Sequence, residues 1–100
     1  MTTALRFSGR QREDGTEVLA VTGEIDMSNS DAFAAAIEHA LPEHGRLLVD
    51  LTAVEYLDSA GLTALFVHAD RIEIVVTALL APTLTISGLA DITTMHQVTG

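Results

Sequence analysis

Cysteine is absent from the 100-residue sequence, so the chain can form neither a disulfide framework nor a thiolate site. Aromatic residues are also scarce, at 4%, whereas apolar residues reach 48%. This composition predicts a core of aliphatic side chains. No linker rich in proline or serine interrupts the sequence, and its length suits one core. We therefore expect a single domain over residues 1–100.

Basic residues are few: five lysines and arginines stand against fourteen aspartates and glutamates, which gives a net charge of −9. A phosphate backbone or an anionic bilayer requires a basic surface that this chain cannot build. Nucleic acid and membrane are therefore poor candidates as direct partners. The negative charge is compatible with a protein partner that has a basic surface.

Long hydrophobic runs are missing as well. The longest, "IVVTALLAP" at residues 74–82, is far shorter than the roughly 20 residues of a spanning helix. The first residues lack the apolar segment of a signal peptide. These features predict a soluble, cytoplasmic protein.

Hydrophobic periodicity predicts the strands of the fold. Alternating or continuous apolar patterns indicate strands at residues 4–8, 17–22, 46–51 and 72–76, and an edge strand near 93–98. The polar turn between the first two strands ends in Asp14-Gly15, which favours a hairpin.

Helical periodicity predicts two helices and a shorter third one. The first helix has an apolar stripe. Ser28 and Asp31 before the stripe resemble a capping box, and Pro42 and Gly45 after it end the helix. The stripe consists of Phe33, Ala36, Ile37, Ala40 and Leu41. The second helix starts after Ser59, with a stripe of Leu62, Leu65, Phe66 and Ala69. The third would lie within 77–88, with Pro82 in its first turn. Single helices between strands predict an α/β fold with a mixed, mainly parallel sheet of about five strands.

The stretch "VEYLDSAGLTALF", residues 54–66, joins a predicted strand to a predicted helix and holds the most informative polar pair. Asp58 and Ser59 are both residue types that cap helix N-termini, an interaction worth about 1 kcal/mol. Ser59 could instead accept a phosphate, which would add charge beside Asp58 and Asp26 and repel a partner matched to the neutral hydroxyl.

A further hypothesis is that the protein is a serine hydrolase with Ser59 as its nucleophile, but the sequence lacks the motifs that this activity requires. No G-x-S-x-G elbow surrounds Ser59. The four histidines, His39, His44, His68 and His96, are expected at surfaces or helix ends rather than as a catalytic base. The spacing of His39 and His44 straddles Pro42 and brings no third ligand, so no metal site is expected.

Three segments of the sequence resemble one family. "VTGEIDMSNSDAF" at 21–33, "LLVDLTAVEYLDSAGLTALF" at 47–66 and "SGLADI" at 87–92 are similar to the STAS domain of bacterial anti-anti-sigma factors. The order of the motifs also matches that family, and the resemblance covers most of the chain from about residue 18. It implies a STAS-like fold. The sequence departs from the family in its short connection "TALFVHADR" at 63–71 and in the brief segment 77–88.

The resemblance implies a role for five residues. Ser59 matches the serine that an anti-sigma factor of the serine protein kinase type phosphorylates, and Asp58 the acidic residue before it. Asp26 matches a turn position that faces the kinase, and Gly61 and Leu62 match the start of the helix that docks on the partner.

The function implied is partner switching without catalysis or cofactor. The unmodified domain would bind the anti-sigma factor and free the sigma factor, phosphorylation would end binding, and a serine phosphatase would restore it. A STAS scaffold or constitutive antagonist that is never phosphorylated is the alternative.

Overall fold

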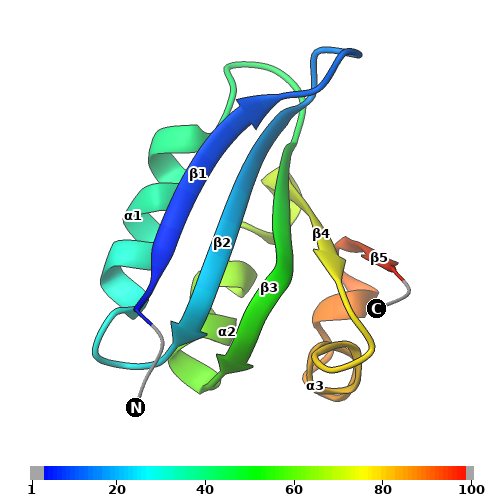
Figure 1. Cartoon of the computed structure of the whole chain (residues 1–100). Coiled ribbons are helices and arrows are strands. Elements are labelled where there is room, and N and C mark those ends of the chain that lie inside the picture. Colours follow the sequence, from blue (N-terminus) through cyan, green and yellow to red (C-terminus); the bar gives the residue numbers. More distant parts are fainter. Residues whose placement is uncertain (1–3, 99–100) are drawn as a thin grey trace.

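The computed structural model describes residues 4–98, which form one five-stranded sheet and three helices (Figure 1). The strands are β1 Arg6–Gln11, β2 Glu17–Ile25, β3 Leu47–Leu57, β4 Ile72–Val76 and β5 Thr94–Gln97. The helices are α1 Ser30–Ala40, α2 Ser59–Val67 and α3 Ala81–Ile86, with short 3-10 turns at Ala69–Arg71 and Leu89–Asp91.

The strands lie in the sheet in the same order as in the sequence. The β1–β2 hairpin is antiparallel, whereas β2, β3, β4 and β5 pair in parallel. This arrangement confirms the predicted α/β fold with a mixed, mainly parallel sheet. Since each parallel connection moves to the next strand in the same direction, right-handed crossovers place the helices on one face of the sheet. Figure 1 shows α1 and α2 together behind the sheet.

The core lies between this face and the helices. It is aliphatic apart from Phe33, as the composition predicts. Its fully buried members include Phe33 and Ile37 from α1, Leu65 from α2 and Ile74 from β4. No helix among residues 4–98 is long and apolar enough to cross a bilayer.

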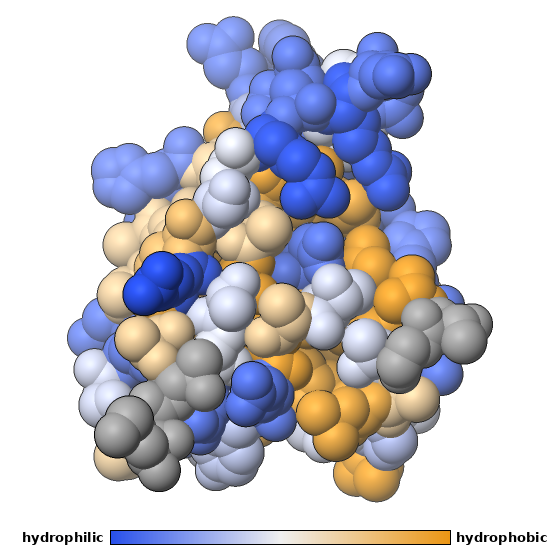
Figure 2. Space-filling model, viewed as in Figure 1, coloured by the Kyte–Doolittle hydropathy of each residue, from blue (hydrophilic) through white to orange (hydrophobic). Residues whose placement is uncertain are grey.

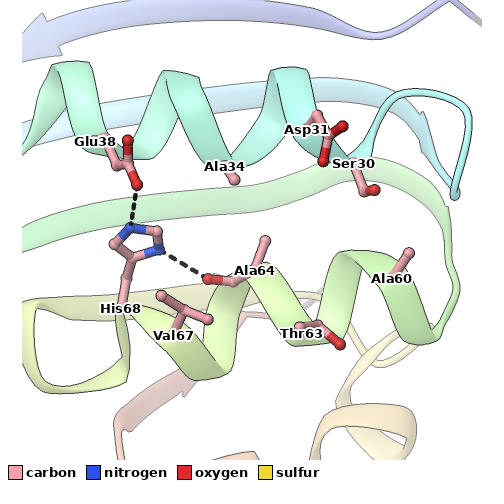
Figure 3. A pocket seen from close by; sticks show the side chains of 9 residues that line it. All are labelled: Ser30, Asp31, Ala34, Glu38, Ala60, Thr63, Ala64, Val67 and His68. Carbon is pink, nitrogen blue, oxygen red and sulfur yellow. Dashed lines mark hydrogen bonds and ion pairs between the residues drawn. The ribbon is translucent and has the colours of Figure 1, made fainter.

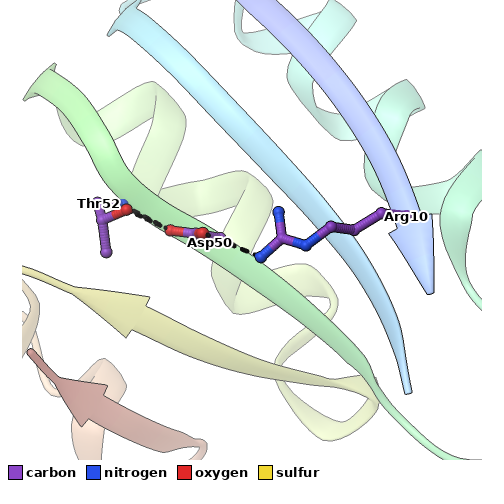
Figure 4. A network of polar contacts seen from close by, with 3 residues as sticks. All are labelled: Arg10, Asp50 and Thr52. Carbon is purple, nitrogen blue, oxygen red and sulfur yellow. Dashed lines mark hydrogen bonds and ion pairs between the residues drawn. The ribbon is translucent and has the colours of Figure 1, made fainter. Parts of the chain in front are cut away.

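The opposite face of the sheet is polar where the hairpin approaches β3 (Figure 4). Arg10 Nη2 on β1 reaches over β2 to within 3.8 Å of Asp50 Oδ2 on β3. Asp50 Oδ1 also accepts hydrogen bonds from the Thr52 hydroxyl and backbone N–H, at 2.7 and 2.9 Å. Figure 2 shows that hydrophilic residues gather at the hairpin end of this view. These contacts keep a carboxylate paired in the middle of the sheet.

β1 begins and ends later than the strand predicted at 4–8, and β2 and β3 are longer than the periodicity predicted. β2 continues to Ile25 and β3 to Leu57, because the two strands pair in parallel as far as these residues. Beyond Thr52, residues 53, 55 and 56 of β3 are exposed and only Val54 and Leu57 are buried. These exposed positions end the continuous apolar run on which the shorter prediction rested. By contrast, the predicted strand at 72–76 is confirmed without change.

The predicted capping box before α1 is wrong. The N-cap is Asn29, and its side chain makes no capping bond to α1. Its amide instead spans the preceding turn, with Oδ1 accepting from the Asp26 N–H and Nδ2 donating to the Glu24 carbonyl, both at 2.9 Å. The Ser28 hydroxyl bonds the Asp26 carboxylate rather than the helix. The turn therefore uses these polar side chains for its own conformation.

The stripe predicted for α2 is right in part. Leu65 is fully buried, but Phe66 is 38% exposed and the core position beside it is taken by Ala64. Ala69 is buried in the following 3-10 turn, because α2 ends at Val67. The third helix is confirmed as a short one, with Pro82 in its first turn. The edge strand predicted near 93–98 is β5, at Thr94–Gln97.

Candidate functional site

The candidate site lies where the carboxyl end of β3 meets the start of α2. Asp58 is the N-cap of α2: its Oδ1 accepts hydrogen bonds from the N–H groups of Ala60 and Gly61, at 2.9 and 3.2 Å. This geometry satisfies two of the backbone donors that a helix start leaves without partners. The capping role that the sequence allowed for either residue of the pair therefore belongs to Asp58.

The other carboxylate oxygen of Asp58 connects α2 to the β2–α1 turn. Oδ2 accepts a hydrogen bond from the Met27 N–H at 3.2 Å, and the Asp58 N–H donates to the Ile25 carbonyl at 3.1 Å. Asp58 thus ties the turn that contains Asp26 to the start of α2. The predicted site residues Asp26 and Asp58 therefore belong to two neighbouring segments that are hydrogen-bonded to each other.

Ser59 is the first residue of α2 and is exposed. Its carbonyl accepts a hydrogen bond from the Thr63 hydroxyl at 2.9 Å. Within residues 4–98, the Ser59 hydroxyl itself forms no hydrogen bond. The side chain therefore faces solvent at the helix start and performs no capping.

Asp26 is held as a charged group by its own turn. Hydrogen bonds from the Ser28 hydroxyl and then from the Ser28 N–H lower the pKa of the Asp26 carboxyl below its usual value. Beside it, Met27 is 82% exposed. The turn therefore presents a stable negative charge and a large apolar side chain next to α2.

Gly61 packs tightly against side chains at the ends of β2 and β3. A Cβ placed at Gly61 would lie 2.7 Å from Ile25 Cγ2 and closer still to Leu57 Cδ1. Glycine is therefore required by packing at this position. Leu62, the last of the predicted site residues, is partly buried and packs against the core. Both residues fix the position of the helix that presents Ser59.

A hydrolase geometry does not assemble around Ser59 among the described residues. His68 is buried at the end of α2, nine residues from Ser59 along the chain, and its Nδ1 lies 2.9 Å from the Ala64 carbonyl oxygen. His96 pairs with Glu73, and His39 and His44 are exposed. Over residues 4–98, no group of three potential metal ligands comes together.

Sequence reasoning missed a groove between α1 and α2 (Figure 3). Its volume is about 350 Å³. It is lined by Ser30, Asp31, Ala34 and Glu38 from α1 and by Ala60, Thr63, Ala64, Val67 and His68 from α2 and its C-cap. The small residues on both helices, with Asp31 and Glu38 two turns apart, are the sequence pattern that could have indicated it.

A comparison with protein families identifies the class of domain. Residues 8–97 match the family model described as Mlab, STAS domain. The chain belongs to this STAS domain family, as its motifs indicated. The match includes both segments that form the site.

Individual relatives agree with this assignment. The chain is 37% identical over 60 residues to the anti-sigma-F factor antagonist RsfB of two Mycobacterium tuberculosis strains, covering 59% of this chain. It spans about half the length of these curated relatives, 49%.

Two solved structures share the fold. An anti-sigma factor antagonist from Mycobacterium paratuberculosis superposes with a TM-score of 0.83 at 25% identity, over 93% of this chain and 86% of the other. The STAS domain of an antisigma-factor antagonist from Rhodobacter sphaeroides gives a TM-score of 0.54 at 19% identity, over 72% and 84%. The second likeness concerns the fold alone.

Proposed function

We propose that this domain is an anti-sigma factor antagonist whose binding is switched by phosphorylation of Ser59. The observation that carries the proposal is the position of the Ser59 side chain. It is exposed at the first residue of α2, and the capping of that helix is already performed by Asp58. The hydroxyl is therefore accessible to a modifying enzyme, and its modification leaves the cap intact.

The local electrostatics support a switch. A phosphate on Ser59 adds about −1.5 to −2 charges. The N–H groups of Ala60 and Gly61, which would otherwise compensate an anion at the helix start, are bonded to Asp58. The added charge therefore remains largely uncompensated beside two carboxylates, Asp58 and Asp26. A partner whose surface fits the neutral hydroxyl loses affinity when it must bury this dianion.

The proposed cycle uses the partner's chemistry and none of the domain's own. With Ser59 unmodified, the domain binds an anti-sigma factor through Asp26, Asp58, Ser59, Gly61 and Leu62, and the sigma factor is freed. The anti-sigma factor, acting as a serine protein kinase, moves the γ-phosphoryl group of ATP to Ser59 Oγ, and ADP and the hydroxyl proton leave. A serine phosphatase hydrolyses the phosphoserine and restores binding. The domain itself is no enzyme, and the cycle operates in the cytoplasm.

Intact-mass spectrometry tests the proposal. The domain is incubated with ATP, magnesium and each candidate anti-sigma kinase, alongside the Ser59→Ala variant. One added phosphate in the wild type and none in the variant is the expected result. Binding without any added mass would replace the switch with a constitutive antagonist or scaffold. Neither binding nor phosphate with any candidate would overturn the proposed function.

A further inference from the structure

The groove between α1 and α2 has an apolar floor and an acidic wall on its α1 side (Figure 3). Ala34 and Ala64 keep the two helices close at its base, and Val67, 67% exposed, extends the apolar surface. Asp31 and Glu38 stand on the α1 side, roughly 10 Å apart because they are two helical turns apart. Such a surface fits a long side chain with an apolar stem and a cationic head.

The hydrogen-bond chemistry at one end of the groove favours a donor. His68 Nδ1 faces the Ala64 carbonyl oxygen at 2.9 Å, so this nitrogen carries the proton. Nε2 of the same ring lies 3.5 Å from Glu38 Oε1, and this contact is an ion pair when the ring is protonated. A carboxylate has two acceptor oxygens, so Glu38 can also accept a hydrogen bond from a cationic N–H group in the groove. The His68 ring is only 10% exposed, so its orientation is fixed by packing.

No basic side chain of this protein supplies that group. The lining contains two carboxylates and no arginine or lysine. The chain has five basic residues in total. All are arginines outside the lining: Arg6, Arg10, Arg12, Arg46 and Arg71. The whole protein carries a net charge of −9, and the groove is a negative part of its surface that attracts a basic partner.

We propose that this groove receives a basic helix of the anti-sigma factor, with one arginine paired with Glu38. The inference rests on the proposed function and extends it. The guanidinium donates to the Glu38 carboxylate, whose two oxygens fit a planar group with five N–H donors better than an ammonium. A second basic residue two turns along that helix pairs with Asp31. The groove begins at Ala60, next to Ser59, so docking and the switch share the start of α2.

Affinity measurements with neutral variants test the inference. Asp31→Asn and Glu38→Gln keep the shape of the groove and remove its charges. Each is expected to weaken binding of the anti-sigma factor by about tenfold, as for close charge pairs at interfaces. Glu13→Gln, an exposed change of the same kind in the β1–β2 turn, controls for net charge and should stay within twofold. If the groove variants bind as Glu13→Gln does, the inference is wrong and the proposed function stands.

A nuclear magnetic resonance titration separates the inference from the proposed function. The probe is an alanine-based helical peptide with arginines seven residues apart, and its control carries glutamine at both positions. The arginine peptide should shift the amide signals of Ala34, Ala64 and Val67, and the Asp31→Asn/Glu38→Gln double variant should abolish this effect. If these shifts occur but no anti-sigma candidate binds the wild type, the groove still binds a basic helix and the proposed function fails. If both peptides act alike or neither acts, the groove has no preference for a cation and the inference fails.

Discussion

The Asp58 carboxylate accepts a hydrogen bond from the Met27 N–H, 31 residues earlier in the chain, at 3.2 Å. Its other oxygen caps α2 through two further backbone bonds. One side chain therefore fixes both the turn that contains Asp26 and the helix that begins with Ser59. The geometry of the proposed switch depends on this residue more than on the serine.

Asp58→Ala is expected to destabilise the domain by about 1–2 kcal/mol, because it removes an N-cap and leaves the Met27 N–H without its acceptor. Ser59→Ala should change the free energy of unfolding by less than about 0.5 kcal/mol, since an exposed side chain without a capping role is replaced. Urea denaturation of both variants measures the difference. Equal losses in the two variants would assign the cap to both residues and contradict this division of roles.

The sequence predicted those elements whose pattern is local. The strand at 72–76 and the buried face of α1 follow from spacing within one segment. The full length of β2 could not be predicted from its own pattern, because β2 continues to Ile25 through pairing with Leu57 on the neighbouring strand β3. The local rule also misassigned Ser28, whose hydroxyl donates a hydrogen bond to the Asp26 carboxylate instead of capping a backbone N–H group of α1.

In the candidate site, too, the local features were predictable from the sequence and the contacts between distant segments were not. The motif placed Asp58 and Ser59 at the start of a helix, and the structure has them there. It could not distinguish the cap from the exposed residue, since both residue types serve as caps. The bond to Met27 and the groove between α1 and α2 depend on segments that are distant in sequence. No pattern within one segment records such contacts.

Gly61→Ala should destabilise the domain by about 1–3 kcal/mol, because the added methyl overlaps Ile25 and Leu57 and forces α2 away from the sheet. Gly9→Ala is the matched control, since nothing lies within 4 Å of a Cβ at that exposed strand position. Thermal unfolding of the two variants provides the comparison. Similar melting temperatures for Gly61→Ala and the wild type would show that α2 tolerates a shift and that the packing is looser than described.

Ser28→Ala should raise the pKa of the Asp26 carboxyl towards its usual value, without reaching it, because the Ser28 backbone N–H still donates. A folded-state pKa below the unfolded one stabilises the protein above about pH 4, and this contribution is lost as the pH falls through the folded value. Titration of the carboxyl carbon signals measures the shift. Asp14, whose pKa is lowered by Thr16 in the hairpin turn, serves as an internal reference and should not change. An unaltered Asp26 titration would show that the Ser28 hydroxyl does not stabilise the charge.

Ser59→Asp should weaken binding of the anti-sigma factor, because it places a third carboxylate beside Asp58 and Asp26. An aspartate carries one charge against the phosphate's −1.5 to −2, so a loss of about tenfold, smaller than that caused by the phosphate, is expected. Thr83→Asp is the control: it adds the same charge at an exposed position on α3, away from the candidate site. Titration calorimetry at low and moderate salt measures both. An affinity for Ser59→Asp equal to that of Thr83→Asp would show that charge at Ser59 does not control binding, and phosphorylation would then have to act through shape alone.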